Sequence, residues 1–328
     1  MRTLPAVSSL RAGLPGVHLA WLVEPRSAGA VEGQPWVDEV LVFPRPQLVG
    51  DLRAGRPIAA WRRFCSFASR LRSRRFDLVL DFHSLARSAL LARLSGAPRR
   101  LGYARPFGRE LSWLLATHRA RLSPRRISRF ERNALLVRYL GVEAPQSRRP
   151  FRVPAIALEQ FRQELGTGAA PVALHPGSSD GTARKRWDPA RFAQLARLFR
   201  DREGIPSVVT WGPARDDRSV AEAVVVGSGG AARLAPRTAD VGALGALLAC
   251  CRLYVGGDTG PLHVASLVGT PVVQLLGATN RIENAPWPET PARSVWSGEG
   301  MDMSPESVFE AGRALLGGGA PEISGDGA

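Results

Sequence analysis

The amino-acid sequence predicts an α/β protein of two domains, each built on a parallel sheet with helices on both faces. Short apolar, β-branched segments alternate with amphipathic segments of helical length along nearly all of the 328 residues, which is the pattern of doubly wound sheets. A Pro- and Arg-rich stretch at 145–154 divides the series and is typical of an interdomain linker. We therefore expect domains at 1–150 and 151–316, and a flexible tail at 317–328 that has too few apolar residues to pack.

In the first half, strands are predicted at the apolar runs 17–23, 40–43 and 78–82. Helices are predicted at 58–76, 85–94, 108–119 and 127–140. Helix 58–76 is the clearest, because Trp61, Phe64, Ala68 and Leu71 fall on one face while most of its arginines face away.

In the second half, strands are predicted at 172–175, 207–211, 232–234, 253–256 and 272–276. The predicted helices are 189–202, 216–226, 241–250, 261–268 and 305–316. Parallel sheets bind ligands outside the carboxyl ends of their strands, so we expect a site there, in a cleft between the two domains. The fold class alone does not choose a reaction.

The charge of the chain is strongly positive and uneven. The sequence has 44 basic and 29 acidic residues, a net charge of +15, and Lys185 is the single lysine. Residues 51–150 hold 23 arginines against 6 acidic residues, whereas residues 151–328 hold 17 basic and 19 acidic residues. Such a field attracts nucleic acid, anionic lipid or a phosphorylated substrate. A solvated arginine-rich surface is the alternative interpretation.

Three cysteines, Cys65, Cys250 and Cys251, have no metal-site spacing, and the two neighbours would form only a strained bridge. We expect reduced, buried thiols and no structural metal, as in a cytosolic protein. No segment has the roughly 18 apolar residues of a spanning helix, and the first residues lack a signal-peptide core. The sequence therefore predicts a cytoplasmic protein that can still lie on a membrane surface.

The first motif follows the predicted strand 172–175 and reads HPGSS, then ARKRW up to Trp187. Glycine and serine in a strand-to-helix connection let N–H groups and hydroxyls approach a phosphate, and Lys185 can place its ammonium against diphosphate oxygens. Lysine is a compact point charge that arginine does not replace, so its survival in this arginine-rich chain favours a functional role over accident. Neither GxxxxGK[ST] nor GxGxxG after a strand occurs.

The second motif, GGDTGPLH at 256–263, lies between a predicted strand and a predicted helix. Thr259 or Gly260 can cap this helix and Pro261 suits its first turn, so that its N–H groups stabilise an oxyanion. Asp258 is expected at the end of its strand, and His263 one turn into the helix can reach the same ligand. A buried, hydrogen-bonded histidine is the alternative for His263 alone.

These two motifs resemble the signatures of glycosyltransferase family 9, the lipopolysaccharide heptosyltransferases. The segments WLVEPRSAGAVEGQPWVDEVLVFPR and FDLVLDFHSLARSALLARLSGAPRRLGYARP resemble its N-terminal domain, and the heptosyltransferase I type is the most similar. The resemblance implies the GT-B fold, two facing Rossmann-like domains with parallel sheets. It also implies inverting, metal-independent transfer of a heptose from ADP-heptose to Kdo in the inner core of lipopolysaccharide, at the cytoplasmic face of a membrane.

The resemblance implies roles for particular residues, with Lys185 and Asp258 as the catalytic pair. The donor would be held by residues of both motifs and by an aspartate after strand 207–211: Ser178, Ser179, Lys185, Asp216 (or Asp217), Asp258, Thr259, Gly260 and His263. The acceptor, an anionic lipid-linked saccharide, would meet the basic first half, with Arg87, Arg105 and Arg129 or Arg132 as carboxylate-binding candidates. Helix 58–76 would lie against anionic lipid or, equally well, dock on its own domain with a solvated arginine face.

The chain departs from the family at its start. Family members begin with a strand and a Gly-Asp pair that carries the proposed general base, whereas Met1 here stands already inside the following helix. We therefore expect an N-terminal domain that lacks its usual first strand, and a chain that binds nucleotide but transfers sugar poorly. A start codon further upstream, or a degenerate member without its base, would each explain the departure.

Three other functions are considered. A non-catalytic nucleotide- or glycan-binding protein would agree with the missing base. A nucleic-acid-binding protein would agree with the charge alone, but the first half has no recognition motif, and we expect no nucleic-acid partner. An NAD-dependent oxidoreductase is the weakest, because the glycine fingerprint is missing.

Overall fold

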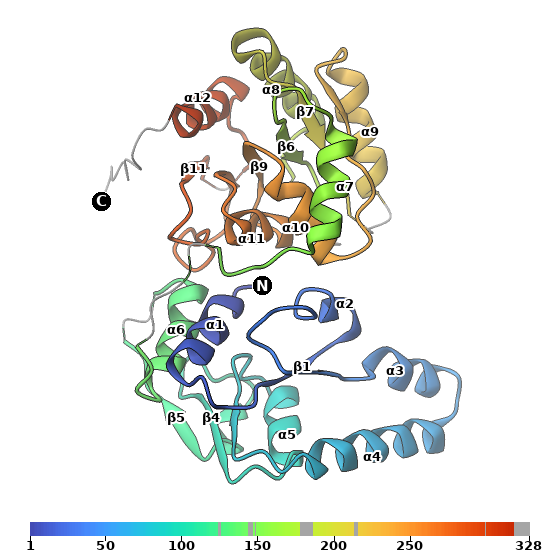
Figure 1. Cartoon of the computed structure of the whole chain (residues 1–328), viewed down its shortest axis with the longest axis vertical. Coiled ribbons are helices and arrows are strands. Elements are labelled where there is room, and N and C mark those ends of the chain that lie inside the picture. Colours follow the sequence, from blue (N-terminus) through green and yellow to red (C-terminus); the bar gives the residue numbers. More distant parts are fainter. Residues whose placement is uncertain are drawn as a thin grey trace. The chain divides into compact units, whose positions relative to one another are not determined.

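The computed structural model of the chain divides into two compact units, Arg2–Gln146 and Ser147–Ala328, here called the N-terminal and C-terminal units (Figure 1). The structure describes residues 1–123, 126–143, 147, 149–177, 186–212, 216–298 and 300–317. Most of the predicted tail lies outside these ranges. No helix among the described residues is long and apolar enough to cross a bilayer.

The C-terminal unit is built on one six-stranded parallel sheet in the order β11-β10-β9-β6-β7-β8. Its strands are β6 (Val172–His175), β7 (Ser207–Val209), β8 (Ala232–Leu234), β9 (Leu253–Gly257), β10 (Val272–Leu276) and β11 (Ala292–Trp296). Its helices are α7 (Ala155–Leu165), α8 (Pro189–Glu203), α9 (Asp217–Gly227), α10 (Val241–Ala249), α11 (Gly260–Val268) and α12 (Pro305–Leu316). Helices α8, α9 and α12 pack together, as do α7, α10 and α11, so both faces of the sheet are covered.

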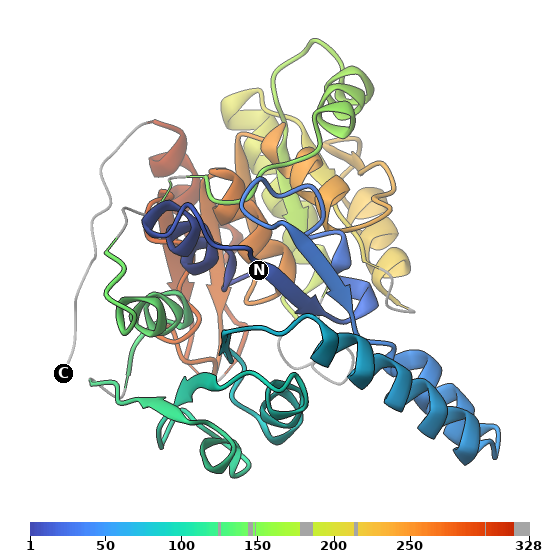
Figure 2. The same cartoon turned by 60° about the horizontal axis from the view of Figure 1, so that its bottom comes forward.

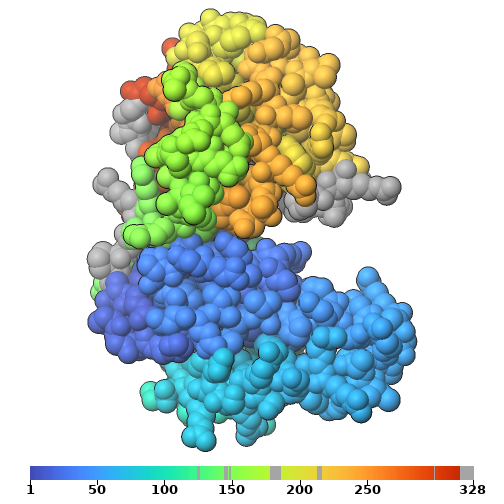
Figure 3. Space-filling model, turned by 45° about the vertical axis from the view of Figure 1, so that its right-hand side comes forward, coloured from blue at the N-terminus to red at the C-terminus, as the bar shows by residue number. Residues whose placement is uncertain are grey.

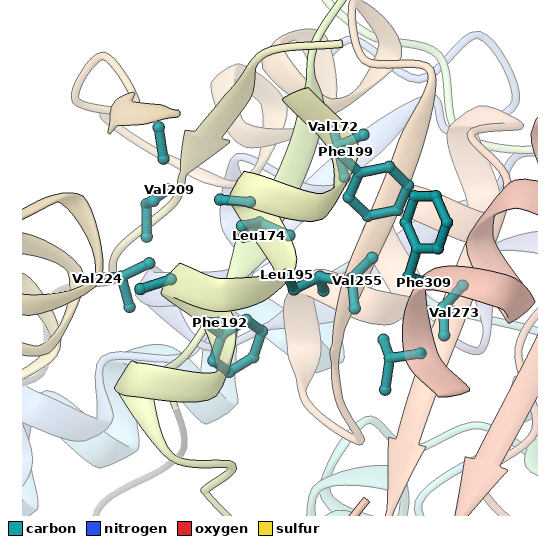
Figure 4. Close-up of a cluster of buried hydrophobic side chains, with 14 of the residues drawn as sticks. Val172, Leu174, Phe192, Leu195, Phe199, Val209, Val224, Val255, Val273 and Phe309 are labelled. Carbon is teal, nitrogen blue, oxygen red and sulfur yellow. The ribbon is translucent and has the colours of Figure 1, made fainter. Parts of the chain in front are cut away.

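The core of the C-terminal unit lies between the sheet and the first of these helix groups (Figure 4). Leu195 and Phe199 of α8 and Phe309 of α12 pack onto the apolar side chains of β6, β9 and β10. The rings of Phe199 and Phe309 lie 5.2 Å apart. Helix α8 begins where the Asp188 carboxylate accepts a hydrogen bond from the Ala190 N–H (2.8 Å), and it ends at Gly204 in the left-handed conformation.

The N-terminal unit contains five strands in two parallel sheets, β1-β2 and β3-β4-β5. The strands are β1 (Ala20–Val23), β2 (Glu39–Val42), β3 (Leu78–Leu80), β4 (Arg99–Tyr103) and β5 (His118–Ala120). The helices are α1 (Leu4–Gly13), α2 (Pro25–Ala28), α3 (Arg45–Arg53), α4 (Pro57–Ser73), α5 (Ala86–Leu94) and α6 (Arg129–Arg138). Figure 2 shows β1 and β2 side by side as dark blue arrows.

The C-terminal unit has one continuous sheet, whereas the strands described in the N-terminal unit fall into two separate sheets. In the C-terminal unit, β6 pairs with β7 on one side and with β9 on the other. Among the described residues of the N-terminal unit, no strand joins β1 to β3. The residues of β1 and β3 are only half-buried, whereas β6 is buried throughout. Helices hold the two sheets together instead: Leu10 of α1 belongs to a cluster that includes both Leu19 and Leu80.

The predicted helix 108–119 is wrong. Glu110 (φ 51°) and Leu111 (φ 58°) adopt the left-handed conformation, which ends any helix at this point, and only a 3-10 turn at Ser112–Leu114 forms before β5. Strands β4, β5 and β11 were not predicted, because β4 opens with two arginines, β5 with His118 and Arg119, and β11 is a half-exposed edge strand.

Exposure divides the apolar face predicted for helix 58–76. Trp61 is 65% exposed, whereas Leu71 is buried, as is Phe67 beside it. Cys65, predicted to be buried, is exposed; Cys250 is half-buried and Cys251 is buried, and all three are free thiols.

We expect the substitution Phe309→Ala to lower the free energy of unfolding of the C-terminal unit by about 3–5 kcal/mol, because it leaves a cavity against Phe199. Val226→Ala is the matched control, since Val226 is 82% exposed and its truncation should cost less than about 0.5 kcal/mol. Chemical denaturation followed by circular dichroism checks both values, and equal effects would show that the assigned core is wrong.

Candidate functional site

The candidate site lies at the carboxyl edge of the C-terminal sheet, where three neighbouring strands end. The sheet order β9-β6-β7 brings the loop that follows each of these strands to the same edge. The loop after β9 leads into α11, and the loop after β7 leads into α9. The first motif begins at His175, the last residue of β6, so both sequence motifs begin at this edge.

The amino end of α11 is open toward a ligand. Thr259 occupies the N-cap position in an extended conformation, its side chain makes no capping hydrogen bond, and Pro261 lies in the first turn. A Cβ atom added at Gly260 would meet no atom within 4 Å. The N–H groups and positive dipole end of this nine-residue helix are therefore accessible to an anion.

Asp258 and His263 are paired beside this helix end. The distance from the His263 Nε2 to the Asp258 Oδ1 is 3.4 Å, and the two side chains are only 4% and 10% exposed. The Asp258 carboxylate fixes the orientation of the His263 imidazole, beside the loop that leads into α11. The structure thus brings Asp258, Thr259, Gly260 and His263 together as the second motif predicts.

The backbone at Gly256 lies so close to Tyr254 and His175 that the side chain of any other residue would crowd them. A Cβ atom at Gly256 would lie 2.6 Å from the Tyr254 hydroxyl and 3.1 Å from the His175 carbonyl oxygen. Burial raises the pKa of Tyr254, and the neighbouring Thr259 hydroxyl only partly offsets this effect. Tyr254 is therefore a neutral support beneath the loop.

His175, the last residue of β6, is held as one neutral tautomer. Its Nδ1 lies 3.0 Å from the Thr210 hydroxyl, and that hydroxyl donates its one proton to the Leu174 carbonyl oxygen (3.2 Å). Nδ1 must therefore donate, which leaves Nε2 as an acceptor. Burial lowers the pKa of His175 to about 4, so the ring is uncharged at neutral pH. Sequence reasoning gave His175 no role, although its position at the end of a buried strand was a usable signal.

The two aspartates that follow β7, Asp216 and Asp217, lie in different surroundings. Asp216 is the exposed N-cap residue of α9 and its side chain makes no capping hydrogen bond. Asp217 is 6% exposed, and its carboxylate lies where a Cβ atom would stand at Gly212 (2.7 Å) and close to that of Gly177 (3.1 Å). Asp217 thus lies inside the packed edge and Asp216 at its surface, and the donor-binding role stays a prediction for one of the two.

Three predicted residues of the first motif, Ser178, Ser179 and Lys185, lie outside the described residues. Arg186, the next residue along the chain, places its guanidinium 3.5 Å from the Asp217 carboxylate. Trp187 is buried and donates a hydrogen bond from its indole nitrogen to the Met303 carbonyl oxygen (3.0 Å). Nowhere in the described ranges do three His, Cys, Asp or Glu side chains gather as they would around a metal ion.

The predicted acceptor arginines belong to the N-terminal unit and follow the carboxyl ends of its three-stranded sheet. Arg87 opens α5 and lies 3.3 Å from Glu24, the residue after β1. Arg105 follows β4 and stacks on the Trp113 ring at 4.6 Å. Arg132 lies over Tyr103 and Phe107, and Arg129 precedes it by one turn of α6.

Asp81, which follows β3, organises the loop that carries Arg87 and was missed by the sequence reasoning. Its carboxylate accepts hydrogen bonds from the N–H groups of His83 (3.1 Å) and Ser84 (2.9 Å) and from the Ser88 hydroxyl (2.9 Å). Burial raises the pKa of Asp81, although these three donors work in the opposite direction. The sequence signal for this loop was the polar segment DFHS at the end of a predicted strand. In the structure Ser84 takes the left-handed conformation there (φ 46°).

We expect His175 to make the protein less stable below neutral pH. Its folded pKa, about 4, lies below the unfolded value of 6.5, so the unfolded chain takes up the proton first. The free energy of unfolding should fall by roughly 3 kcal/mol as the pH drops from about 6.5 to about 4. His175→Gln should flatten this dependence in denaturation curves, whereas His118→Gln, at an exposed position, should leave it unchanged. An unchanged slope in His175→Gln would contradict the assignment.

We expect Gly256→Ala to destabilise the C-terminal unit by about 1–3 kcal/mol through overpacking against Tyr254. The double variant Gly256→Ala with Tyr254→Phe should recover part of this loss, because the nearest atom is the Tyr254 hydroxyl. Gly260→Ala is the control and should leave the melting temperature unchanged, since the added carbon meets open space. Thermal denaturation measures all three, and equal melting temperatures for the two single variants would refute the close approach.

The comparisons with known proteins point to one family. The model of glycosyltransferase family 9 (heptosyltransferase) matches residues 64–306. Lipopolysaccharide heptosyltransferase 1 of Pseudomonas aeruginosa is 31% identical over 296 residues, covering 85% of this chain and 76% of that protein. Lipopolysaccharide heptosyltransferase 3 of Escherichia coli is 26% identical over 313 residues, covering 92% of this chain and 86% of that protein.

Solved structures show the same fold. A glycosyltransferase of family 9 from Veillonella parvula superposes with a TM-score of 0.79 at 23% identity, covering 96% of this chain and 92% of that one. The E. coli heptosyltransferase WaaC with ADP superposes with a TM-score of 0.77 at 21% identity, covering 94% and 93%. The resemblance inferred from the two motifs is confirmed: the chain belongs to glycosyltransferase family 9, the heptosyltransferases, and glycosyl transfer is its chemistry.

Proposed function

We propose that this chain transfers a heptose from ADP-heptose to the Kdo or inner-core region of a lipopolysaccharide precursor, with inversion and without a metal ion. The observation that carries the proposal is the open amino end of α11 with the buried Asp258–His263 pair beside it. The curated relatives are named as lipopolysaccharide heptosyltransferases, and WaaC has been solved with ADP and with ADP-2-deoxy-2-fluoro heptose.

The donor side would act by stabilising the departing ADP. Cleavage of the sugar–phosphate bond leaves negative charge on the diphosphate, and the dipole of α11 together with Lys185 and the neighbouring Arg186 would offset that charge in place of a divalent cation. Ser178 and Ser179 would add hydroxyl contacts. Asp258 and His263 would hold the heptose, and Asp217 would bind the adenosine ribose.

The acceptor side would recognise carboxylate and phosphate. Arg87, Arg105, Arg129 and Arg132 follow the carboxyl ends of the three-stranded sheet, where a ligand of a parallel sheet is expected. Guanidinium groups pair with carboxylates and phosphates in a bidentate manner, which suits the Kdo carboxylate. The reaction would then take place on the cytoplasmic side, where a lipid-linked precursor meets a nucleotide sugar.

A second candidate is a member of the family that binds nucleotide sugar and transfers it weakly. Two described carboxylates at the carboxyl ends of β1 and β3 are already engaged, which favours this candidate. Glu24 lies within 3.3 Å of both Arg45 and Arg87. Asp81 accepts three hydrogen bonds from its own loop. Neither is poised to take a proton from an acceptor hydroxyl, so a general base has to come from elsewhere.

We expect Lys185→Ala and Lys185→Arg both to weaken ADP binding by about 10- to 100-fold, which corresponds to the loss of a charge-assisted hydrogen bond. Lys185→Arg should fail because a planar fork does not replace a compact ammonium. Asp258→Asn should weaken binding of ADP-heptose more than binding of ADP. Asp201→Asn, at an exposed position, is the control. Isothermal titration calorimetry gives the affinities.

A transfer assay with ADP-heptose and a Kdo-terminated acceptor separates the two candidates. Robust product formation by the 328-residue chain, read by mass spectrometry, supports the transferase and excludes the weak member. ADP-heptose binding without turnover supports the weak member. Lack of nucleotide binding combined with salt-sensitive binding to duplex DNA would overturn both candidates.

A further inference from the structure

Helices α3 and α4 form a hairpin that extends away from the rest of the N-terminal unit (Figures 1 and 2). The space-filling view shows the same residues as a lobe at the right-hand edge (Figure 3). The end of this hairpin carries three large apolar side chains that face solvent: Leu52 is 58% exposed, Ile58 is 69% exposed and Trp61 is 65% exposed. We call these residues, with Arg53 and Arg62, the hairpin tip.

The exposed side chains of the tip are not those by which α4 packs on its own unit. Helix α4 already packs on its own unit through Ala60, Phe67 and Leu71, which are buried, and the Phe67 ring meets Phe43 edge-on at 5.2 Å. Ile58 and Trp61 are one turn apart on a different face, and Trp61 stacks on the half-buried Phe64 at 6.0 Å. The helix therefore has one face for its own unit and a second apolar patch at its end.

The surroundings of the patch are almost wholly cationic. Residues 45–75 contain nine arginines and one acidic residue, Asp51. Asp51 is buried and takes ion pairs from Arg56 (2.9 Å) and Arg63 (3.0 Å), so it fixes the turn between the helices. Arg53 and Arg62 remain exposed next to Leu52 and Trp61. The tip thus combines a tryptophan and two aliphatic side chains with two exposed arginines.

This combination fits an anionic lipid bilayer. Tryptophan favours the boundary between headgroups and acyl chains, aliphatic side chains enter the outermost apolar layer, and arginines pair with lipid phosphates. Nucleic acid would be matched by the arginines but would leave Leu52 and Ile58 in water. We propose that the hairpin tip is a membrane anchor that inserts Leu52, Ile58 and Trp61 into the surface of an anionic bilayer. The proposal stands on the tip alone and does not require the proposed heptosyl transfer.

The first experiment is cosedimentation of the full chain with vesicles. Binding should be strong with vesicles of phosphatidylethanolamine and phosphatidylglycerol, and weak with phosphatidylcholine alone. The triple variant Leu52→Ser, Ile58→Ser, Trp61→Ser should lose binding by more than tenfold. Arg53→Gln with Arg62→Gln should weaken it by roughly fivefold for each arginine, and added salt should do the same.

The matched control is Ile156→Ser with Val226→Ser, which removes two apolar side chains that are 86% and 82% exposed in the C-terminal unit. This variant should bind vesicles like the parent chain. ADP affinity and melting temperature should be unchanged in every variant, which shows that the chain remains folded and separates this test from the test of transfer. Equal vesicle binding by the triple variant and the parent would overturn the proposal, as would equal binding to both vesicle types.

A second experiment reports insertion directly. Cys65 is exposed one turn from Trp61 and accepts an environment-sensitive fluorophore, in a Cys250→Ser variant because Cys250 is half-buried. Emission should shift to the blue with phosphatidylglycerol vesicles and not with duplex DNA. A shift with DNA that the triple variant leaves intact, or no shift with vesicles, would show that the tip serves a different partner.

Discussion

The candidate site depends on the close approach of three loops at the ends of buried parallel strands. Because β6 and β7 are buried throughout and β9 is buried up to Gly256, their backbones are fixed by packing on both faces. Gly177, Gly212 and Gly256 each stand where a Cβ atom would crowd a polar side-chain group of the same edge. The absence of three side chains therefore makes room for the Asp217 carboxylate, the His175 ring and the Tyr254 hydroxyl.

This packing also decides where charge remains. Burial keeps His175 and Tyr254 neutral, so they support the loops without adding a field of their own. The polar groups left at the edge are the Asp258 and His263 side chains and the Asp217–Arg186 pair, together with the dipole of α11. The C-terminal unit, which is nearly neutral overall, can thus offer a local anion site, whereas the N-terminal unit would attract an anion through its many arginines.

The sequence allowed accurate prediction where packing is strongest. β6, β10 and α12 have the predicted bounds, because buried, largely apolar runs or a capped amphipathic repeat leave little choice, and the short edge strand β8 has them too. The helix at 108–119 failed because nothing in the local pattern predicts left-handed backbone at Glu110. Asp216 and Asp217 differ by one position, about 100° around a helix, and only the structure shows which one turns inward. The exposure of Trp61 was left open for a similar reason, since periodicity does not say which apolar side chains of a helix are used for packing.

The broken sheet of the N-terminal unit has a consequence for the acceptor arginines. With no described strand between β1 and β3, the ends of the two sheets are linked by side chains, among them the ion pair of Glu24 and Arg87 at 3.3 Å. Glu24 also lies near Arg26 and Arg45, so one carboxylate is shared by three guanidinium groups. An acceptor carboxylate that pairs with Arg87 has to compete with Glu24, which keeps its contacts with Arg26 and Arg45 when it loses that partner. Arg87 therefore serves two purposes, as a tie between the sheets and as a candidate anion ligand, whereas Arg105 and Arg132 are oriented by the aromatic rings on which they lie.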